Sequence, residues 1–180
     1  KPLGSLEVVG ETAQSGTKIT FLADDEIFES VIYSFDVLSN RLRELSFLNR
    51  GVAISALDER TGKSREFKYE GGIKSFVEHL NKNKPVLHES VIYLAGEQNE
   101  CAVEVALQYN DGYQENVFSY ANNINTIEGG SHLVGFRSAL TRTINYYAQK
   151  NNLLRDLREN PTGEDIREGL TAVISVKLLD

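Results

Sequence analysis

The last quarter of the chain restricts the possible folds most, because a long helical pattern is followed there by a strand pattern. From Ser131 to about Gln149, apolar residues recur every three or four positions, which predicts a helix with one apolar face. Its expected inward positions are Leu133, Phe136, Leu140, Ile144 and Tyr147. Ser131 is the predicted N-cap. Thr171–Leu178 alternates and predicts a strand. The apolar face of such a helix has to pack on another layer, and such a strand has to pair within a sheet. Together the two elements indicate a mixed α+β protein.

A short helix with its own start signal lies between these two elements. Thr162-Gly163-Glu164-Asp165 resembles a capping box in which Asp165 replaces the usual Glu or Gln. Carboxylates in the first turn of a helix are stabilised by the free backbone amides there. We therefore interpret Glu164 and Asp165 as helix-stabilising groups and not as an acid–base pair, and we expect the helix to end near Gly169.

The middle of the chain predicts an antiparallel sheet with one covered face. Cys101–Tyr109 alternates cleanly, Asn110–Tyr113 has turn residues, and Asn116–Tyr120 has a second strand pattern. We expect the second of these strands to return beside the first as a hairpin.

The first half predicts a helix packed on strands. Its expected elements are a strand at Lys18–Phe21, a helix at Phe35–Leu48, a hairpin of residues 52–57 and 65–69, and a helix at Ile73–Leu80. Two adjacent glycines leave the backbone free to turn at Gly71–Gly72. We place a domain boundary there.

The charge balance restricts how such a chain can contact nucleic acid. Its formal net charge is −7, from 19 Lys and Arg against 26 Asp and Glu. Nucleic-acid affinity comes mostly from neutralised phosphates, so any DNA contact needs a local basic patch. Arg137 and Arg142 lie on the predicted long helix, but five residues separate them by about 140° around the axis. They need not share a face, and taken alone they are a weak signal.

Neither a catalytic set nor a metal set is visible in the spacing. The chain has no Gly-rich phosphate loop ending in Gly-Lys-Ser/Thr and no G-x-G-x-x-G. His79, His88 and His132 are scattered and lack partners at metal-ligand spacing. The single cysteine, Cys101, excludes an intrachain disulfide, which fits a reducing cytoplasm. No apolar run is long enough for a transmembrane helix, so no membrane association is expected.

Several segments resemble the B subunits of DNA gyrase, the ATPase subunits of bacterial type IIA topoisomerases. In chain order they are Ser15–Thr17, Phe21–Asp24, Arg41–Asn49, Tyr69–Ile73, Leu80–Lys84, Gly129–His132, Gly135–Arg137 and Glu168–Lys177. They span nearly the whole chain. The resemblance implies that residues 1–71 are the C-terminal portion of a GHKL-type ATPase sandwich. It implies that residues 72–180 are a transducer domain, lacking its final part, with a left-handed βαβ crossover like that of ribosomal-protein domains.

The resemblance also implies the function and partners of the parent protein. Members of the family couple ATP binding and hydrolysis, with Mg²⁺, to DNA strand passage and negative supercoiling. The transducer relays the nucleotide state to the DNA gate. The expected partners are a gyrase A-type subunit and a second B subunit, in a heterotetramer, together with double-stranded DNA.

Two residues take site roles from the resemblance. Thr17 matches the threonine at the floor of the adenine pocket, and Arg137 matches a basic residue facing the cavity through which DNA passes. The family's catalytic glutamate, its Mg²⁺-binding asparagine and its ATP lid would precede Lys1, and its γ-phosphate-binding lysine would follow Asp180. The chain is thus expected to be a fragment without catalytic residues, which neither hydrolyses ATP nor binds it tightly.

Two alternatives remain open. The chain resembles the gyrase subunit more than the B-type subunit of topoisomerase IV, which is the first alternative. The second is a stand-alone, non-catalytic, transducer-like module that binds nucleic acid or a protein partner.

Overall fold

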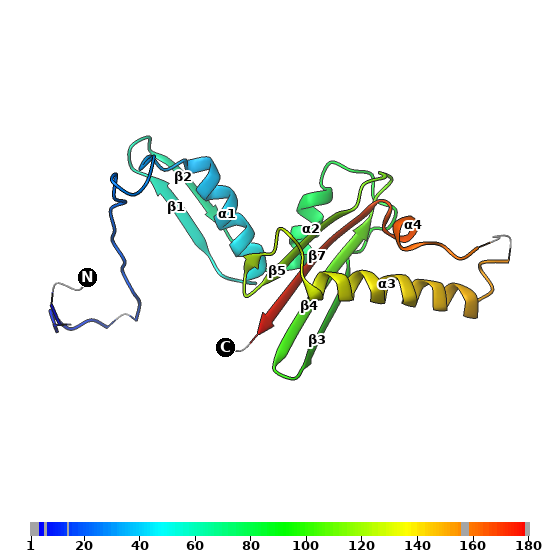
Figure 1. The fold of residues 1–180 in the computed structure, drawn as a ribbon. Coiled ribbons are helices and arrows are strands. Elements are labelled where there is room, and N and C mark those ends of the chain that lie inside the picture. The colour runs from blue at the N-terminus through cyan, green and yellow to red at the C-terminus, as the bar shows by residue number, and fades with distance from the viewer. Residues whose placement is uncertain (1–3, 6, 14, 156–158, 179–180) are drawn as a thin grey trace. The chain divides into compact units, whose positions relative to one another are not determined.

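The computed structural model describes residues 4–5, 7–13, 15–155 and 159–178. The chain divides into two units, Lys1–Tyr33 and Ser34–Asp180 (Figure 1). The helices and strands of the described residues are α1 Phe35–Leu48, β1 Ile54–Asp58, β2 Lys63–Phe67, α2 Ile73–Asn81, β3 Ile92–Gln98, β4 Cys101–Tyr109, β5 Asn116–Ala121, β6 Ile124–Asn125, α3 Ser131–Lys150, α4 Gly163–Arg167 and β7 Leu170–Leu178.

The first unit has neither helix nor strand in its described residues. The strand predicted at Lys18–Phe21 is therefore wrong. Its apolar side chains are largely exposed, at 81% for Ile19 and 74% for Phe21. Alternation selects a strand only where a second strand takes up the backbone N–H and C=O groups, and no such ladder forms along these residues.

The second unit is organised by a five-stranded sheet in the order β3-β4-β7-β5-β6. The expected hairpin of β4 and β5 is wrong, because β7 lies between them, antiparallel to β4 and parallel to β5. β5 and β7 are joined through α3 and α4, which makes a βαβ crossover (Figure 1). Leu170 to Val176 are all buried, as a central strand covered on both faces requires. The smaller hairpin of β1 and β2 is confirmed, with Ile54 opposite Phe67.

The two faces of the sheet carry separate hydrophobic clusters. On one face, α1 and α2 contribute Phe47 and Phe76, whose rings stack at 4.8 Å between centroids, over Ala106 and Val173 of the sheet. The other face is covered by α3, with the residues Leu133, Phe136 and Leu140 packed on Val105, Leu107, Leu170, Ala172 and Ile174. The second unit is thus an α+β sandwich with the sheet as its middle layer.

The long helix α3 departs from its prediction at both ends. Its N-cap is Gly130 and not Ser131, which is the first helical residue. Tyr147 is 62% exposed, although its position was expected to face the sheet. Figure 1 shows the reason: the C-terminal half of α3 extends past the sheet, so its residues have no strand to pack on.

His79, near the end of α2, makes stability depend on pH. The centroid of its ring is 5.5 Å from that of the Phe47 ring, and its pKa is lowered from 6.5, first by burial and then by the positive charges of Arg43 and Lys82. The unfolded chain therefore binds a proton more readily than the folded one, so stability is lost as the pH falls below about 6.5. Urea unfolding at pH 7.5 and pH 5.5 should show a smaller pH-dependent loss in His79→Gln than in the wild type. An equal loss in both would contradict this assignment.

Candidate functional site

A cluster of two arginines and one glutamate joins α3, α4 and the segment before β5. Glu115 Oε1 accepts a hydrogen bond from Arg137 Nε at 2.8 Å, and Glu115 Oε2 accepts one from Arg167 Nε at 3.1 Å. Exposed fractions are 40% for the side chain of Arg137, 24% for Glu115 and 17% for Arg167. Such partly buried ion pairs are screened less by salt than fully exposed ones.

The capping box predicted at Thr162 positions α4 and hence Arg167. The Thr162 amide donates to Asp165 Oδ2 at 2.7 Å, and the Asp165 amide donates to Thr162 Oγ1 at 3.2 Å. The Thr162 hydroxyl also donates to Asp165 Oδ2 at 2.7 Å, and this bond, followed by that of the Thr162 amide, lowers the pKa of the Asp165 carboxyl and keeps it ionised at the helix N-terminus. The other end of α4 is tied to the sheet by Tyr109, whose hydroxyl donates to the Ile166 carbonyl at 2.7 Å.

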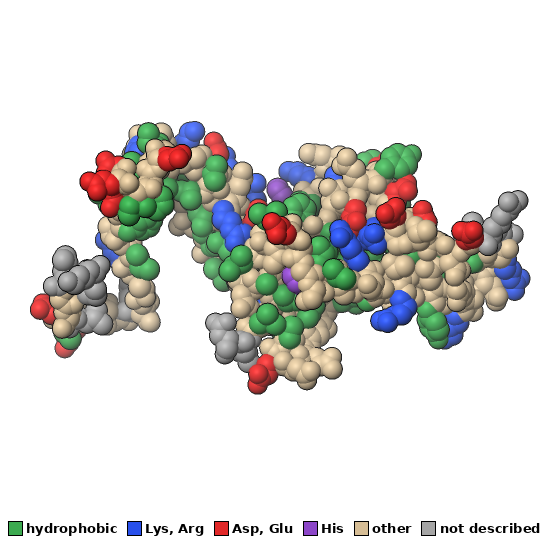
Figure 2. All heavy atoms as spheres, viewed as in Figure 1, with side chains coloured by type: hydrophobic (Ala, Val, Ile, Leu, Met, Phe, Trp, Pro, Cys, Tyr) green, Lys and Arg blue, Asp and Glu red, His purple; other side chains and the backbone are tan. Residues whose placement is uncertain are grey.

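A basic hollow of about 440 Å³ lies beside this cluster. Its lining consists of Val134, Arg137, Ser138, Thr141, Arg142 and Arg167. The spacing of Arg137 and Arg142 did not require a common face, yet the structure brings both to this one surface. Figure 2 shows Lys and Arg side chains over the region of α3 and, next to them, Asp and Glu side chains over the region of α4. Three arginines line the hollow on a chain whose net charge is −7, and Glu115 pairs with two of them. The helix α4 also carries Glu164 and Asp165 in its first turn.

A glycine in the first turn of α4 leaves the space that Arg167 occupies. A Cβ added at Gly163 would lie 2.7 Å from Arg167 Nη1 and 3.2 Å from Thr141 Oγ1. The guanidinium of Arg167 thus lies directly over the backbone of Gly163, and any larger residue at position 163 would narrow the space that it occupies.

Sequence reasoning missed Arg167 and Glu115. They are 52 residues apart, and Glu115 is 22 residues from Arg137. No helical or strand period connects positions so distant. The only signal in the sequence was Arg167 itself, as a basic residue in the last turn of α4. The favourable interaction of a positive charge with the C-terminal end of the helix dipole already explains a basic residue at that position.

The other predicted features are placed as follows. Thr17 is exposed, in a stretch without helix or strand, so the structure leaves its adenine-binding role a prediction. Within the described ranges, no three His, Cys, Asp or Glu side chains are grouped to hold a metal ion. The helices of the described residues are too short or too polar to cross a bilayer.

Comparison with known families decides the relationship. The family model for DNA gyrase B matches residues 72–180, which is more than half of the chain.

The chain belongs to the DNA gyrase B family.

Individual relatives agree with that family. The B subunit of DNA gyrase from Clostridium acetobutylicum is 56% identical over the whole of this chain, which spans 28% of that relative. Its counterpart from Bacillus mycoides is 53% identical over 98% of the chain and 44% of the relative. The chain therefore corresponds to less than half of the length of these gyrase B proteins.

Solved structures agree on the fold. The 43K ATPase domain of Thermus thermophilus gyrase B, in complex with an aminocoumarin, superposes with a TM-score of 0.76 at 38% identity, over 87% of this chain and 43% of that one. A topoisomerase IV ATP-binding domain from Francisella tularensis has a TM-score of 0.69 at 21% identity, which shows only a shared fold. The α+β fold inferred from the sequence is that of the ATPase region of gyrase B.

Proposed function

We propose that this chain is the part of a gyrase B protein that connects ATP hydrolysis to the passage of DNA. Residues 72–180 would act as the transducer, and the whole protein would work in the cytoplasm with a gyrase A-type subunit and a second B subunit. In this proposal the parent enzyme introduces negative supercoils, using ATP and Mg²⁺. The observation that carries the DNA part is the basic hollow around Arg137, because an acidic chain needs such a local patch to hold phosphates.

The assignment of domains is part of the proposal. The family match starts at residue 72, which supports a boundary at Gly71–Gly72. α1 nevertheless shares a hydrophobic cluster with α2 and the sheet. We therefore propose that residues 34–71 belong to the ATPase domain by descent but pack on the transducer, which provides a rigid connection for relaying the nucleotide state.

The nucleotide-binding part of the proposal rests on the resemblance alone. Thr17 would contribute to the adenine pocket in the intact protein, and the catalytic groups would lie outside these 180 residues. We accordingly expect the purified chain to show no ATP turnover above background in a phosphate-release assay. Turnover at the rate of an intact gyrase B protein would contradict the assignment of its catalytic groups to other parts of the protein.

Replacement of Arg137 tests the DNA-contacting role. In an intact gyrase B protein carrying this segment and assembled with an A-type subunit, Arg137→Gln should lower ATP-dependent supercoiling by about three- to tenfold, since the loss of one phosphate contact weakens DNA binding. Arg155→Gln is the matched control, because Arg155 is an exposed arginine outside the hollow. Equal supercoiling by Arg137→Gln and the wild type would contradict the proposed role.

A further inference from the structure

We propose that Arg137, Arg142 and Arg167 together form one binding site for phosphates of the DNA backbone, and that Glu115 is its built-in counter-ion, which keeps binding weak and reversible. This inference rests on the proposed function and adds to it two further binding residues and a residue that tunes their affinity.

Arg167 belongs to the site on geometric grounds. It lines the same hollow as Arg137, and one carboxylate holds both side chains. Each arginine donates only its Nε–H to Glu115, and among the described residues no other side-chain acceptor holds either guanidinium. The terminal Nη groups of both therefore have no side-chain acceptor among the described residues, with Arg167 Nη1 lying close over Gly163. Guanidinium groups bind phosphate through paired N–H donors.

The hollow itself suits a phosphate group. Arg142 adds a third positive charge, and Ser138 and Thr141 line the hollow with small polar side chains. Thr141 Oγ1 donates to the Arg137 carbonyl at 2.9 Å, which fixes that side chain on α3. Among the described lining residues, Val134 alone is apolar. The three positive charges of this lining favour an anionic ligand.

Glu115 acts on the site without blocking it. It is not a lining residue of the hollow, and it contacts both arginines only at Nε. Its negative charge lowers the net charge of the three arginines from +3 to +2 and so opposes an incoming phosphate. A duplex that must pass through the protein has to be released as well as held, and a resident carboxylate weakens the contact without removing it.

The test is binding of a fluorescein-labelled 20-base-pair duplex to the full 180-residue chain, followed by anisotropy between 50 and 200 mM salt. We expect Arg137→Gln, Arg142→Gln and Arg167→Gln each to weaken binding about three- to tenfold and to reduce the salt slope by about one. Arg167→Lys keeps the charge but loses the paired donors, so its affinity should lie between those of the wild type and Arg167→Gln. Arg155→Gln is the control.

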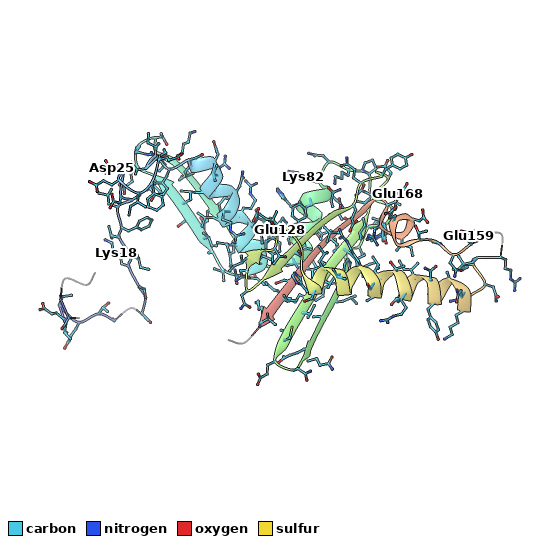
Figure 3. All side chains as sticks on the ribbon, in the orientation of Figure 1. Lys18, Asp25, Lys82, Glu128, Glu159 and Glu168 are labelled. Atoms are coloured by element: carbon cyan, nitrogen blue, oxygen red, sulfur yellow. The ribbon has the colours of Figure 1, made fainter. Side chains whose placement is uncertain are left out.

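Glu115→Gln should tighten binding by about three- to tenfold, because the amide keeps the shape and one acceptor for Nε while removing the charge. Glu128→Gln is the matched control: Glu128 is exposed in the turn before α3 (Figure 3), and its loss should change binding by less than twofold. Glu115→Asp provides a second variant that retains the charge on a shorter side chain, and we expect its affinity to lie between those of the wild type and Glu115→Gln. Thermal melting of every variant confirms folding.

The outcomes separate the two proposals. If Arg137→Gln weakens binding but Arg142→Gln and Arg167→Gln do not, the three-arginine site is wrong and the proposed DNA contact at Arg137 stands. If a folded Glu115→Gln or Glu115→Asp binds more weakly than the wild type, Glu115 orients the arginines and is not a counter-ion. If no arginine substitution changes binding, the hollow is not a DNA contact, and the proposed function fails at this site as well.

Discussion

Gly169→Ala is expected to destabilise the second unit by about 3 kcal/mol or more, because it combines backbone strain with a collision. Gly169 has φ of +70°, a conformation that residues with a Cβ rarely adopt. A Cβ there would lie 2.3 Å from the Asn110 carbonyl oxygen and 2.7 Å from that of Gly112. These contacts cannot relax independently, since the Asn110 amide donates to the Gly169 carbonyl at 2.9 Å.

Two other glycines provide controls for this result. Gly62 has a similar φ of +68°, but a Cβ added there would meet no described atom within 4 Å, so Gly62→Ala should cost only about 1 kcal/mol of strain. Gly135 lies in α3 with open space around it, and Gly135→Ala should be neutral or stabilise by up to about 1 kcal/mol. Urea unfolding measures all three. If Gly169→Ala and Gly62→Ala lowered the free energy of unfolding by the same amount, the collision of the Gly169→Ala methyl group with the two carbonyl oxygens would be relieved at no cost.

Asn81→Ala is expected to cost about 3 kcal/mol or more, because it leaves several buried polar groups without partners. Asn81 is 3% exposed at the end of α2. Its Nδ2 donates to Gln108 Oε1 at 3.0 Å, while its Oδ1 accepts from Thr171 Oγ1 at 2.8 Å and from Asn110 Nδ2 at 3.3 Å. This network ties α2 to β4 and β7 through the middle of the fold.

A double-mutant cycle with Thr171→Val checks that the loss comes from the network. The two substitutions remove the same hydrogen bond, so their combined effect should be smaller than the sum of the single effects by about 1 kcal/mol. Asn83→Ala is the matched control, because Asn83 is exposed just beyond α2, and it should change stability by less than about 0.5 kcal/mol. Strict additivity, or a loss for Asn83→Ala as large as for Asn81→Ala, would contradict the network's role.

Local patterns in the sequence predicted the elements that depend on near neighbours. The capping box of Thr162 and Asp165 is confirmed, since its two hydrogen bonds span only three residues. The inward face of α3 is confirmed at Leu133, Phe136 and Leu140, where the helix lies over the sheet. The burial that the same periodicity predicted for Tyr147 is wrong, because a helical period does not indicate where the sheet under the helix ends.

The sequence by itself determined the helices of the second unit, most of its strands and, through family resemblance, the relationship to gyrase B. Tertiary structure alone decided that β7 enters between β4 and β5, since alternation specifies the buried face of a strand but not its neighbours. That insertion brings α4 back beside α3 and sets Arg167 against Glu115 and Arg137. The physical reason is range: turns, caps and periods act over a few residues, whereas this basic site depends on sheet pairing that joins residues far apart in the chain.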